Sequence, residues 1–225
     1  MNRTSESPEA ANRPAMRRDA LRNRERLLQA AREVLAEQGH SAGVDEISRR
    51  AGVGMGTLYR HFPTKDDLLL TLRQELLEEV LHRVEQTAEE QPVGYGLEAC
   101  LWTVGAEMQR HHGYLGVLWQ AFPPNGDPQR LRFWALVRPL LAEAKAAQRV
   151  REDLALTDVF VCILSIRGLM DDTAARAPDA WRRHLALLLA GFRPSEQQLE
   201  YPPSVDDSLV ESGVPHSSVM ARPSD

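Results

Sequence analysis

Cysteine is scarce in this chain of 225 residues: only Cys100 and Cys162 occur, each among apolar neighbours and neither in a CxxC pair. Two isolated cysteines give neither a disulfide framework nor a zinc-binding set of thiolates, so we expect small buried side chains. Lysine is scarce too, since only Lys65 and Lys145 are lysine among 27 basic residues. We attribute the preference for arginine to a GC-rich genome rather than to a function.

Long hydrophobic runs are also missing. No segment approaches the roughly 18 consecutive apolar residues of a membrane span, and the N-terminal residues contain no apolar stretch that could serve as a secretion signal. We therefore expect a cytoplasmic protein with no membrane partner. A hydrophobic content of 43% is sufficient for a packed core.

The motifs of common enzyme classes do not occur either. The chain has no GxSxG, no GxxxxGK[ST] and no cysteine–histidine pair at a recognisable spacing. His111–His112 and Asp171–Asp172 are adjacent pairs, and adjacent side chains on a helix diverge by about 100°, so we expect no metal site. We predict no cofactor and no enzymatic activity, and an enzyme on a helical scaffold is the weakest alternative.

The charge is divided unevenly along the chain. Residues 12–65 carry eleven Lys and Arg against six Asp and Glu, although the whole chain has a net charge of -5. A basic head and an acidic body suggest that the head meets a polyanion while the body does not.

Apolar residues recur at a helical spacing through most of the chain, and no convincing alternation of period two occurs. We predict an all-α fold of about nine helices: 17–38, 44–51, 55–62, 64–90, 95–112, 114–122, 128–149, 157–176 and 179–192. Residues 1–16 and 194–225 are rich in polar residues and proline, and we expect a disordered arm and a disordered acidic tail there. The predicted domains are residues 17–63 and residues 64–193.

The stretch AGVGMGTLYRHFPTKDDLL, residues 51–69, contains three closely spaced glycines. A phosphate-binding loop would need a preceding strand and a GxGxxG or GxxxxGK[ST] spacing, whereas here the spacing is GxGxG and a helix precedes it. A helical interpretation gives each glycine its own role. Gly52 ends one short helix in a left-handed conformation, Gly54 caps the next helix, and Gly56 has no side chain, so the backbone of that helix can approach a partner closely. Two short helices joined by a tight turn predict a helix-turn-helix.

Capping signals support these boundaries. Gly43 is the expected N-cap of the helix over 44–51, and Pro63 should end the helix before it. Thr64 and Asp67 have the spacing of a capping box, which predicts that a long helix begins there.

The run VDEISRRAGVGMGTLYRHFPTKDDLL, residues 44–69, resembles the DNA-binding domain of the tetracycline-repressor (TetR) family of bacterial regulators. The resemblance covers about 45 residues, from the first helix to the start of the fourth. It implies that Thr57, Tyr59 and Lys65 contact DNA phosphates, that Gly54, Met55 and Gly56 face base edges, and that Arg60 and His61 lie near the groove walls. Gly-Met replaces the commoner Ser-Lys or Ser-Arg at residues 54 and 55, so apolar or shape readout is expected to outweigh hydrogen-bonded base readout.

Several arginines of the head supply charge that can neutralise phosphates: Arg17, Arg18, Arg22, Arg49, Arg50 and Arg60. For each single arginine, a solvated surface charge is an equally good interpretation.

The body is expected to bind a second copy of the chain and a small molecule, as the resemblance implies. Large apolar residues and a few polar ones are the candidates for the pocket: Trp102, Met108, His112, Trp119, Phe122, Phe133, Trp134, Arg138, Arg167, Met170 and Asp171. The candidates for the dimer interface are Val159, Ile163, Ile166, Trp181, Leu185 and Leu188. Both sets are also compatible with an ordinary monomer core, because periodicity does not identify the partner.

Together these features predict a homodimeric repressor that binds a palindromic double-stranded operator and is released by an unidentified small-molecule effector. A DNA-binding protein without a ligand is the alternative, although its body should be basic rather than acidic.

Overall fold

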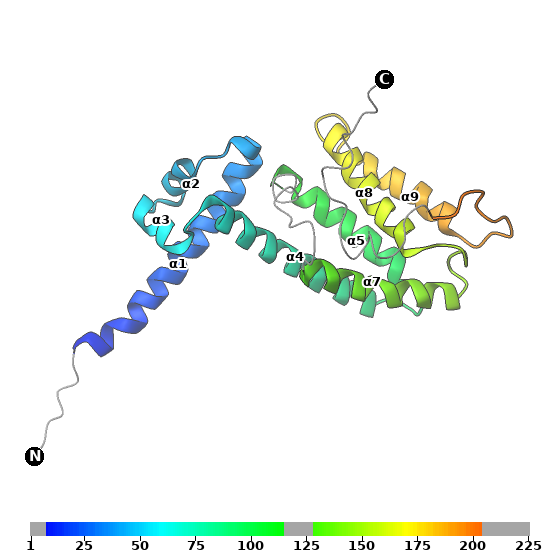
Figure 1. Ribbon diagram of the computed structural model, residues 1–225, viewed down its shortest axis with the longest axis horizontal. Helices are drawn as coiled ribbons and strands as arrows, with labels where there is room; N and C mark the ends of the chain where they lie inside the picture. The colour runs from blue at the N-terminus through cyan, green and yellow to red at the C-terminus, as the bar shows by residue number, and fades with distance from the viewer. Residues whose placement is uncertain (1–7, 115–127, 204–225) are drawn as a thin grey trace, which may run out of the picture. The chain divides into compact units, whose positions relative to one another are not determined.

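The computed structural model describes residues 8–114 and 128–203, and within these ranges all regular structure is helical (Figure 1). The elements are α1 (Pro8–Gln38), the 3₁₀ turn η1 (Gly39–Ser41), α2 (Val44–Ala51), α3 (Met55–His61), α4 (Lys65–Glu89), α5 (Gly96–Arg110), α7 (Pro128–Ala146), α8 (Leu156–Thr173) and α9 (Ala180–Phe192). The predicted all-α class is confirmed. The helix expected over 114–122 lies almost wholly outside the described residues.

The described chain forms two compact units. The head unit comprises residues 8–73 with residues 113 and 114, and the body unit comprises residues 74–112 and 128–203. The division falls within α4, after Arg73, rather than at its start, because Leu68, Leu69 and Leu72 of the first turns are buried in the core. In the part of the chain that is described, no helix is both long enough and apolar enough to cross a membrane.

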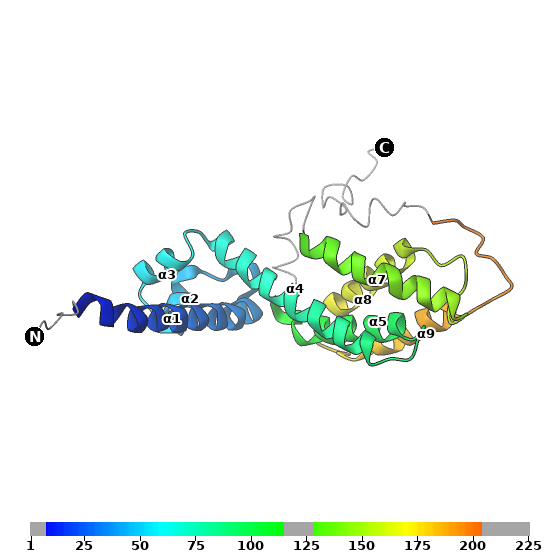
Figure 2. The ribbon, with the colours of Figure 1, turned by 90° about the horizontal axis from the view of Figure 1, so that it is seen from below.

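The core of the head unit is built where α1 packs against α2 and α3 (Figure 2). Its side chains are at most 3% exposed and come from every helix of the unit: Leu27, Ala31, Val34, Leu35, Ile47, Leu58, Phe62, Leu68 and Leu72. The spacing of these residues in α1 is the helical period that the sequence shows, so a single face of α1 supplies most of the contact.

Helix α1 begins earlier than expected. It starts at Pro8, so residues 8–16 of the predicted disordered arm are helical, and residues 1–7 lie outside the described part. Proline is favoured at the first position of a helix, and the alanine and arginine residues that follow have high helix propensity. The composition of the arm was misleading because a helix can extend from a packed segment without a core of its own.

In the body unit, α5 packs against α7, α8 and α9. Its core includes Leu97, Leu101, Val104, Val137, Leu154, Trp181 and Leu185. Gly105 of α5 lets the indole of Trp181 approach closely, since a Cβ at this position would overlap the ring, with Cε3 only 2.8 Å away.

The predicted disordered tail is ordered at its start. The buried guanidinium of Arg151 donates a hydrogen bond to the carbonyl oxygen of Gln197 (2.8 Å), and the amide of Leu199 donates one to the carboxylate of Asp153 (3.2 Å). These partners lie 46 residues apart in sequence, so local composition does not reveal them. Residues 204–225 lie outside the described part.

Candidate nucleic-acid interface

The turn between α2 and α3 requires glycine at residue 52. Gly52 has φ 62° and ψ 39°, the left-handed conformation that ends α2. Its amide donates to the carbonyl of Arg49, and the amide of Val53 donates to the carbonyl of Ser48, both at 3.1 Å. A Cβ here would also lie 2.7 Å from Nη2 of Arg26, which donates to the Gly52 carbonyl at 3.3 Å. The predicted left-handed helix end is confirmed.

The two glycines at the start of α3 have a different role. Gly54 is the N-cap, with φ −69° and ψ 149°, and its carbonyl accepts the amides of Thr57 (2.9 Å) and Leu58 (3.1 Å). A Cβ added at Gly54 or Gly56 would meet nothing within 4 Å. Neither packing nor backbone conformation therefore demands glycine there, and the bare surface is available to a partner that approaches closely.

Helix α3 presents a polar and aromatic face away from the core. Leu58 is fully buried, whereas Tyr59 is 47% exposed and Arg60 is exposed beside it. Met55, Thr57 and His61 are partly exposed. The helix ends at Phe62, whose extended backbone (φ −135°, ψ 95°) is the conformation that the following Pro63 favours.

The start of α4 is fixed by side-chain hydrogen bonds. Thr64 Oγ1 accepts the amide of Asp67 (3.1 Å), and the Asp67 carboxylate accepts the amide of Thr64 (3.0 Å), which is the predicted capping box. Lys65 Nζ donates to the carbonyl oxygen of Ala42 at 2.6 Å, in the turn before α2. Lys65 thus has an intramolecular role besides the expected phosphate contact.

Three of the arginines expected to neutralise phosphates have carboxylate partners within the chain, and that of Arg22 is distant, with Nη1 3.9 Å from Asp19. Arg49 forms a bidentate pair with Glu46, with N–O distances of 2.7 and 2.6 Å. Arg50 forms one with Glu37, at 2.7 and 2.8 Å, and also reaches Glu46 at 3.3 Å. These hydrogen bonds lower the pKa of both carboxyl groups. Arg17, Arg18, Arg22 and Arg60 are exposed.

The pocket candidates of the body unit gather in two places. Trp134 packs edge-on against Phe133 and Phe160, with ring centroids 5.0 and 5.9 Å apart. The rings of Trp102 and Trp181 lie 5.9 Å apart. Met108, Trp134 and Met170 are buried and Arg138 is exposed, while Trp119 and Phe122 lie outside the described residues.

Three polar candidates meet between the end of α5 and α8. The Asp171 carboxylate lies 3.3 Å from Nε2 of His112 and 3.2 Å from Nη1 of Arg167. All three were selected from the sequence as polar groups of a pocket, and the fold brings them together.

The residue that sequence reasoning missed is Glu107, which is only 3% exposed. Its carboxylate lies 3.3 Å from Arg83, 3.4 Å from Arg110 and 3.3 Å from Nε2 of His111. Burial lowers the pKa of His111, although the nearby Glu107 acts against that shift. The spacing of four residues between Glu107 and His111 was the available signal, since such residues share a helix face.

This cluster also contains the group of side chains best placed to hold a metal ion in the described part of the chain. Ligand atoms of Glu79, Glu107 and His111 lie within 4.8 Å of one another. Arg83 already bridges the two carboxylates, at 2.9 Å from Glu79 and 3.3 Å from Glu107. The cluster is therefore electrically balanced by the chain itself.

Five of the six residues predicted for the dimer interface are buried within a single chain. Val159, Ile163, Ile166, Trp181 and Leu185 are at most 5% exposed and form the core of a single chain. Their spacing marks the buried face of each helix, which packs on the body unit itself. Leu188 remains partly exposed, and the large apolar residues that α8 and α9 expose are Val161 and Leu187, each 57% exposed.

The head unit matches a known family of proteins. Residues 27–72 match the family model described as "Bacterial regulatory proteins, tetR family". A fatty acid metabolism regulator protein of Bacillus subtilis is 38% identical over 65 residues, which are 28% of this chain and 34% of that protein. The transcriptional activator FasR of Mycolicibacterium smegmatis is 39% identical over 85 residues, 37% of this chain and 39% of that one. The match thus spans little more than a third of these relatives.

Solved structures extend the likeness over both units. A TetR transcriptional regulator from Streptomyces coelicolor is 30% identical, with a TM-score of 0.56 over 76% of this chain and 99% of its own. The regulator FadR of Bacillus subtilis, solved in complex with stearoyl-CoA, has the same fold at 23% identity, with a TM-score of 0.54 over 74% of this chain and 98% of its own. The helix-turn-helix geometry and the 30% identity to a TetR regulator, covered over 99% of its length, show that the chain belongs to the TetR family of bacterial regulatory proteins.

Proposed function

We propose that the protein is a DNA-binding transcriptional regulator that reads a double-stranded operator with α3. The observation that carries the proposal is the outward face of α3, where Tyr59 and Arg60 are exposed beside bare backbone at Gly54 and Gly56. In a helix-turn-helix, the second helix enters the major groove with its N-terminal residues toward the bases. Thr57, Tyr59 and Lys65 are assigned to phosphates, which set register and orientation.

Sequence reading is assigned to Gly54, Met55 and Gly56. Glycines offer no side-chain hydrogen bond, so base discrimination rests on apolar contacts of Met55 and on the close approach of backbone to the groove. The remaining sequence discrimination comes from DNA shape, and Arg60 and His61 lie near the groove walls. Arg49 contributes less than its charge suggests, because Glu46 neutralises it.

The regulator is proposed to act as a homodimer on a palindromic operator. One short reading helix covers few base pairs, and two heads related by a two-fold axis double the contact. Val161 and Leu187 are exposed apolar side chains on α8 and α9, and they support an interface on these helices in place of the buried residues first selected.

A small-molecule effector is proposed to bind the body unit and to lower the affinity for the operator, so that the protein is a repressor released by its ligand. The aromatic group around Trp134 and the polar group of His112, Arg167 and Asp171 combine apolar surface with converging polar atoms, as ligand sites do. The effector acts only if it binds the two conformational states with different affinities.

The deciding experiment selects genomic fragments that the purified protein retains and measures the affinity for them by fluorescence anisotropy. We expect one enriched palindromic sequence, bound by two chains. Tyr59→Phe should weaken binding to operator and random duplex by a similar factor, because it removes only a phosphate contact. Arg176→Gln, an exposed arginine of the body unit between α8 and α9, serves as the control. Retention of no sequence above background, with folded protein, contradicts the proposal.

A further inference from the structure

Helix α1 extends well beyond the part of it that packs in the head unit. Going along α1 from Arg17, the first buried side chains are Leu27 and Leu28, whereas none of residues 17–26 is buried and only Asn23 and Arg24 are partly covered. The N-terminal part of α1 projects past α2 and α3 (Figure 1, Figure 2). We call residues 17–26 the α1 extension. Because it covers no core, its surface is available to a partner.

The α1 extension is strongly basic. Five of its ten residues are arginine, against Asp19 and Glu25, so its net charge is +3. Arg18, Arg22 and Arg26 are spaced by four residues and therefore lie along one face of the helix, which we call the arginine stripe. Like charges at this spacing repel each other and destabilise a helix. The stripe is therefore unfavourable for the isolated head and becomes favourable when a polyanion neutralises it.

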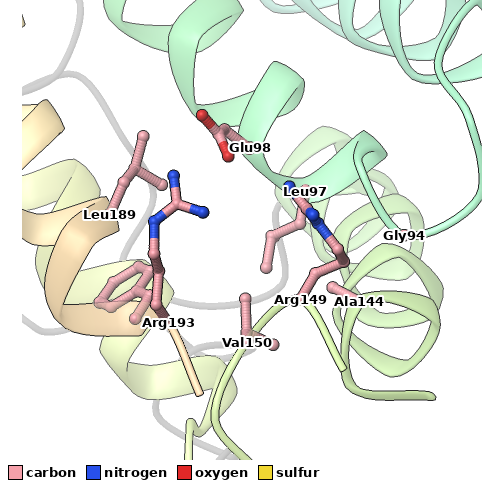
Figure 3. A pocket seen from close by; sticks show the side chains of 9 residues that line it. Gly94, Leu97, Glu98, Ala144, Arg149, Val150, Leu189 and Arg193 are labelled. Carbon is pink, nitrogen blue, oxygen red and sulfur yellow. The ribbon is translucent and has the colours of Figure 1, made fainter. Parts of the chain in front are cut away.

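Exposed arginines of the body unit are arranged differently. Arg149 and Arg193 flank a small recess that the carboxylate of Glu98 also lines (Figure 3). Arg182 donates a hydrogen bond to the carboxylate of Asp179 at 3.1 Å. Each of these groups includes a carboxylate close to its arginines.

The acidic residue nearest to the arginine stripe along the sequence does little to neutralise it. Oδ1 of Asp19 lies 3.9 Å from Nη1 of Arg22, which is beyond hydrogen-bond distance, and both side chains are 71% exposed. Exposed pairs of this kind are screened by salt and contribute little.

The α1 extension is joined directly to the helix-turn-helix. Nη2 of Arg26 donates to the carbonyl oxygen of Gly52 at 3.3 Å, in the turn that leads into α3. The guanidinium of Arg24 lies over the ring of Phe62, the residue that follows α3, with Cζ 5.8 Å from the ring centroid. The arginine stripe thus runs outward from the N-terminal end of α3, which is the end that a helix-turn-helix directs toward the bases.

We propose that the α1 extension is a second DNA-binding element, which contacts the phosphates of the duplex beyond the base pairs that α3 reads. Arginines on one helix face neutralise phosphates without reading sequence. The extension is about 15 Å long, at 1.5 Å per residue, so it adds a few phosphates to the contact of each head. It acts only on DNA that α3 has already bound, and this assignment therefore rests on the proposed function.

Other partners fit the α1 extension less well. A protein partner would need apolar surface, and Leu21, which is 61% exposed, is the one large apolar side chain among residues 17–26. A membrane surface would need an apolar helix face opposite the basic one, and one leucine does not form such a face. Duplex DNA requires only the positive charge that the extension carries.

The test compares two duplexes that contain the same operator. The short duplex ends with the palindrome, and the long one has about ten further base pairs of arbitrary sequence on each side, which add about 34 Å per side. In fluorescence anisotropy, the full chain should bind the long duplex at least about fivefold tighter at low salt, with a steeper salt dependence and for two unrelated flanking sequences. Equal affinity for the two duplexes overturns this assignment and leaves the proposed function of α3 intact. Binding to neither duplex contradicts both.

Variants assign the preference to the arginine stripe. Arg18→Gln/Arg22→Gln should bind the short duplex as the unaltered chain does and lose most of the preference for the long one, with a salt slope lower by about two for each head bound. Asp19→Asn should enlarge the preference, because it removes a negative charge beside Arg22. Arg176→Gln/Arg193→Gln removes two exposed arginines of the body unit and is the matched control, which should keep the preference. Thermal melting verifies that the variants fold. An undiminished preference in the folded Arg18→Gln/Arg22→Gln variant would refute the role of the stripe.

Discussion

The ammonium of Lys65 donates a 2.6 Å hydrogen bond to the carbonyl oxygen of Ala42, which links the first residue of α4 to the turn that precedes α2. A residue expected to meet DNA phosphate therefore also holds together two segments of the head unit. Substitution of Lys65 should affect both stability and DNA binding, and the two effects can be measured separately.

Lys65→Met is expected to lower the melting temperature, because the partly buried Ala42 carbonyl loses its donor. It should also flatten the dependence of log affinity on log salt by about one, the contribution of one lost phosphate contact. Anisotropy at four salt concentrations, below the melting transition, measures the slope. An unchanged slope with a lowered melting temperature would leave Lys65 a structural role only.

Gly56→Ala is expected to stabilise the protein and to weaken its binding to the operator. Alanine in a helix is favoured over glycine by about 0.5–1 kcal/mol, and the added methyl meets nothing within 4 Å in the protein. The same methyl would occupy the space where DNA approaches, so operator affinity should fall by more than tenfold. Urea unfolding and anisotropy measure the two quantities. Affinity equal to that of the unaltered chain would show that the bare surface is not used.

Gly105→Ala should destabilise the body unit by about 1–3 kcal/mol, the usual cost of overpacking, because the methyl would overlap the Trp181 ring. Gly168→Ala in α8 is the matched control, since a Cβ there has no neighbour within 4 Å. Urea unfolding followed by tryptophan fluorescence compares the two. Equal stability of both variants would mean that α5 and α9 are less tightly packed than their geometry indicates.

Glu37→Gln is expected to strengthen non-specific DNA binding. Arg50 then keeps only its longer contacts, to Glu46 at 3.3 Å and Glu33 at 3.9 Å, and becomes more available to a phosphate, which should steepen the salt slope by at most about one. Asp66→Asn removes the same charge from an exposed position near the start of α4 and controls for long-range electrostatics. The same slope in both variants would argue that Arg50 stays away from DNA.

The anchoring of residues 197–199 should depend on pH. Hydrogen bonds from Arg151, and then from the Leu199 amide, lower the pKa of Asp153 from 3.8 to about 2. A lowered pKa means that the folded state favours the charged carboxylate, so the contribution to stability is complete above about pH 4 and is lost as the pH falls toward 2. An NMR titration of the Asp153 carboxyl should have its midpoint near pH 2, and Asp153→Asn should abolish hydrogen-exchange protection of the Leu199 amide. A midpoint near pH 4 would contradict the anchoring.

The helix-turn-helix could be predicted because its determinants are local. Each determinant affects only neighbours within about five residues along the chain, and each has its expected role: Gly52, Gly54, Pro63 and the Thr64–Asp67 pair. The all-helical class followed from periodicity for the same reason.

The features that were not predicted depend on contacts between distant segments, which a periodic pattern does not reveal. Glu37 meets Arg50 from 13 residues away, so the charge available to DNA was overcounted. Burial of Val159 and Ile166 reflects which neighbour covers a helix face, and an apolar stripe is the same whether that neighbour belongs to the same chain or to a second copy. The docking of Leu199 on Asp153 joins segments that only the tertiary fold brings together.

The glycine positions of α3 bear on how this regulator should be engineered. Since alanine at residue 56 is expected to stabilise the fold, a library selected only for heat resistance or yield should enrich for that substitution. Such selections would deliver robust chains that no longer recognise their operator. Residues 54–56 should therefore be held constant whenever the protein is optimised as a sensor component.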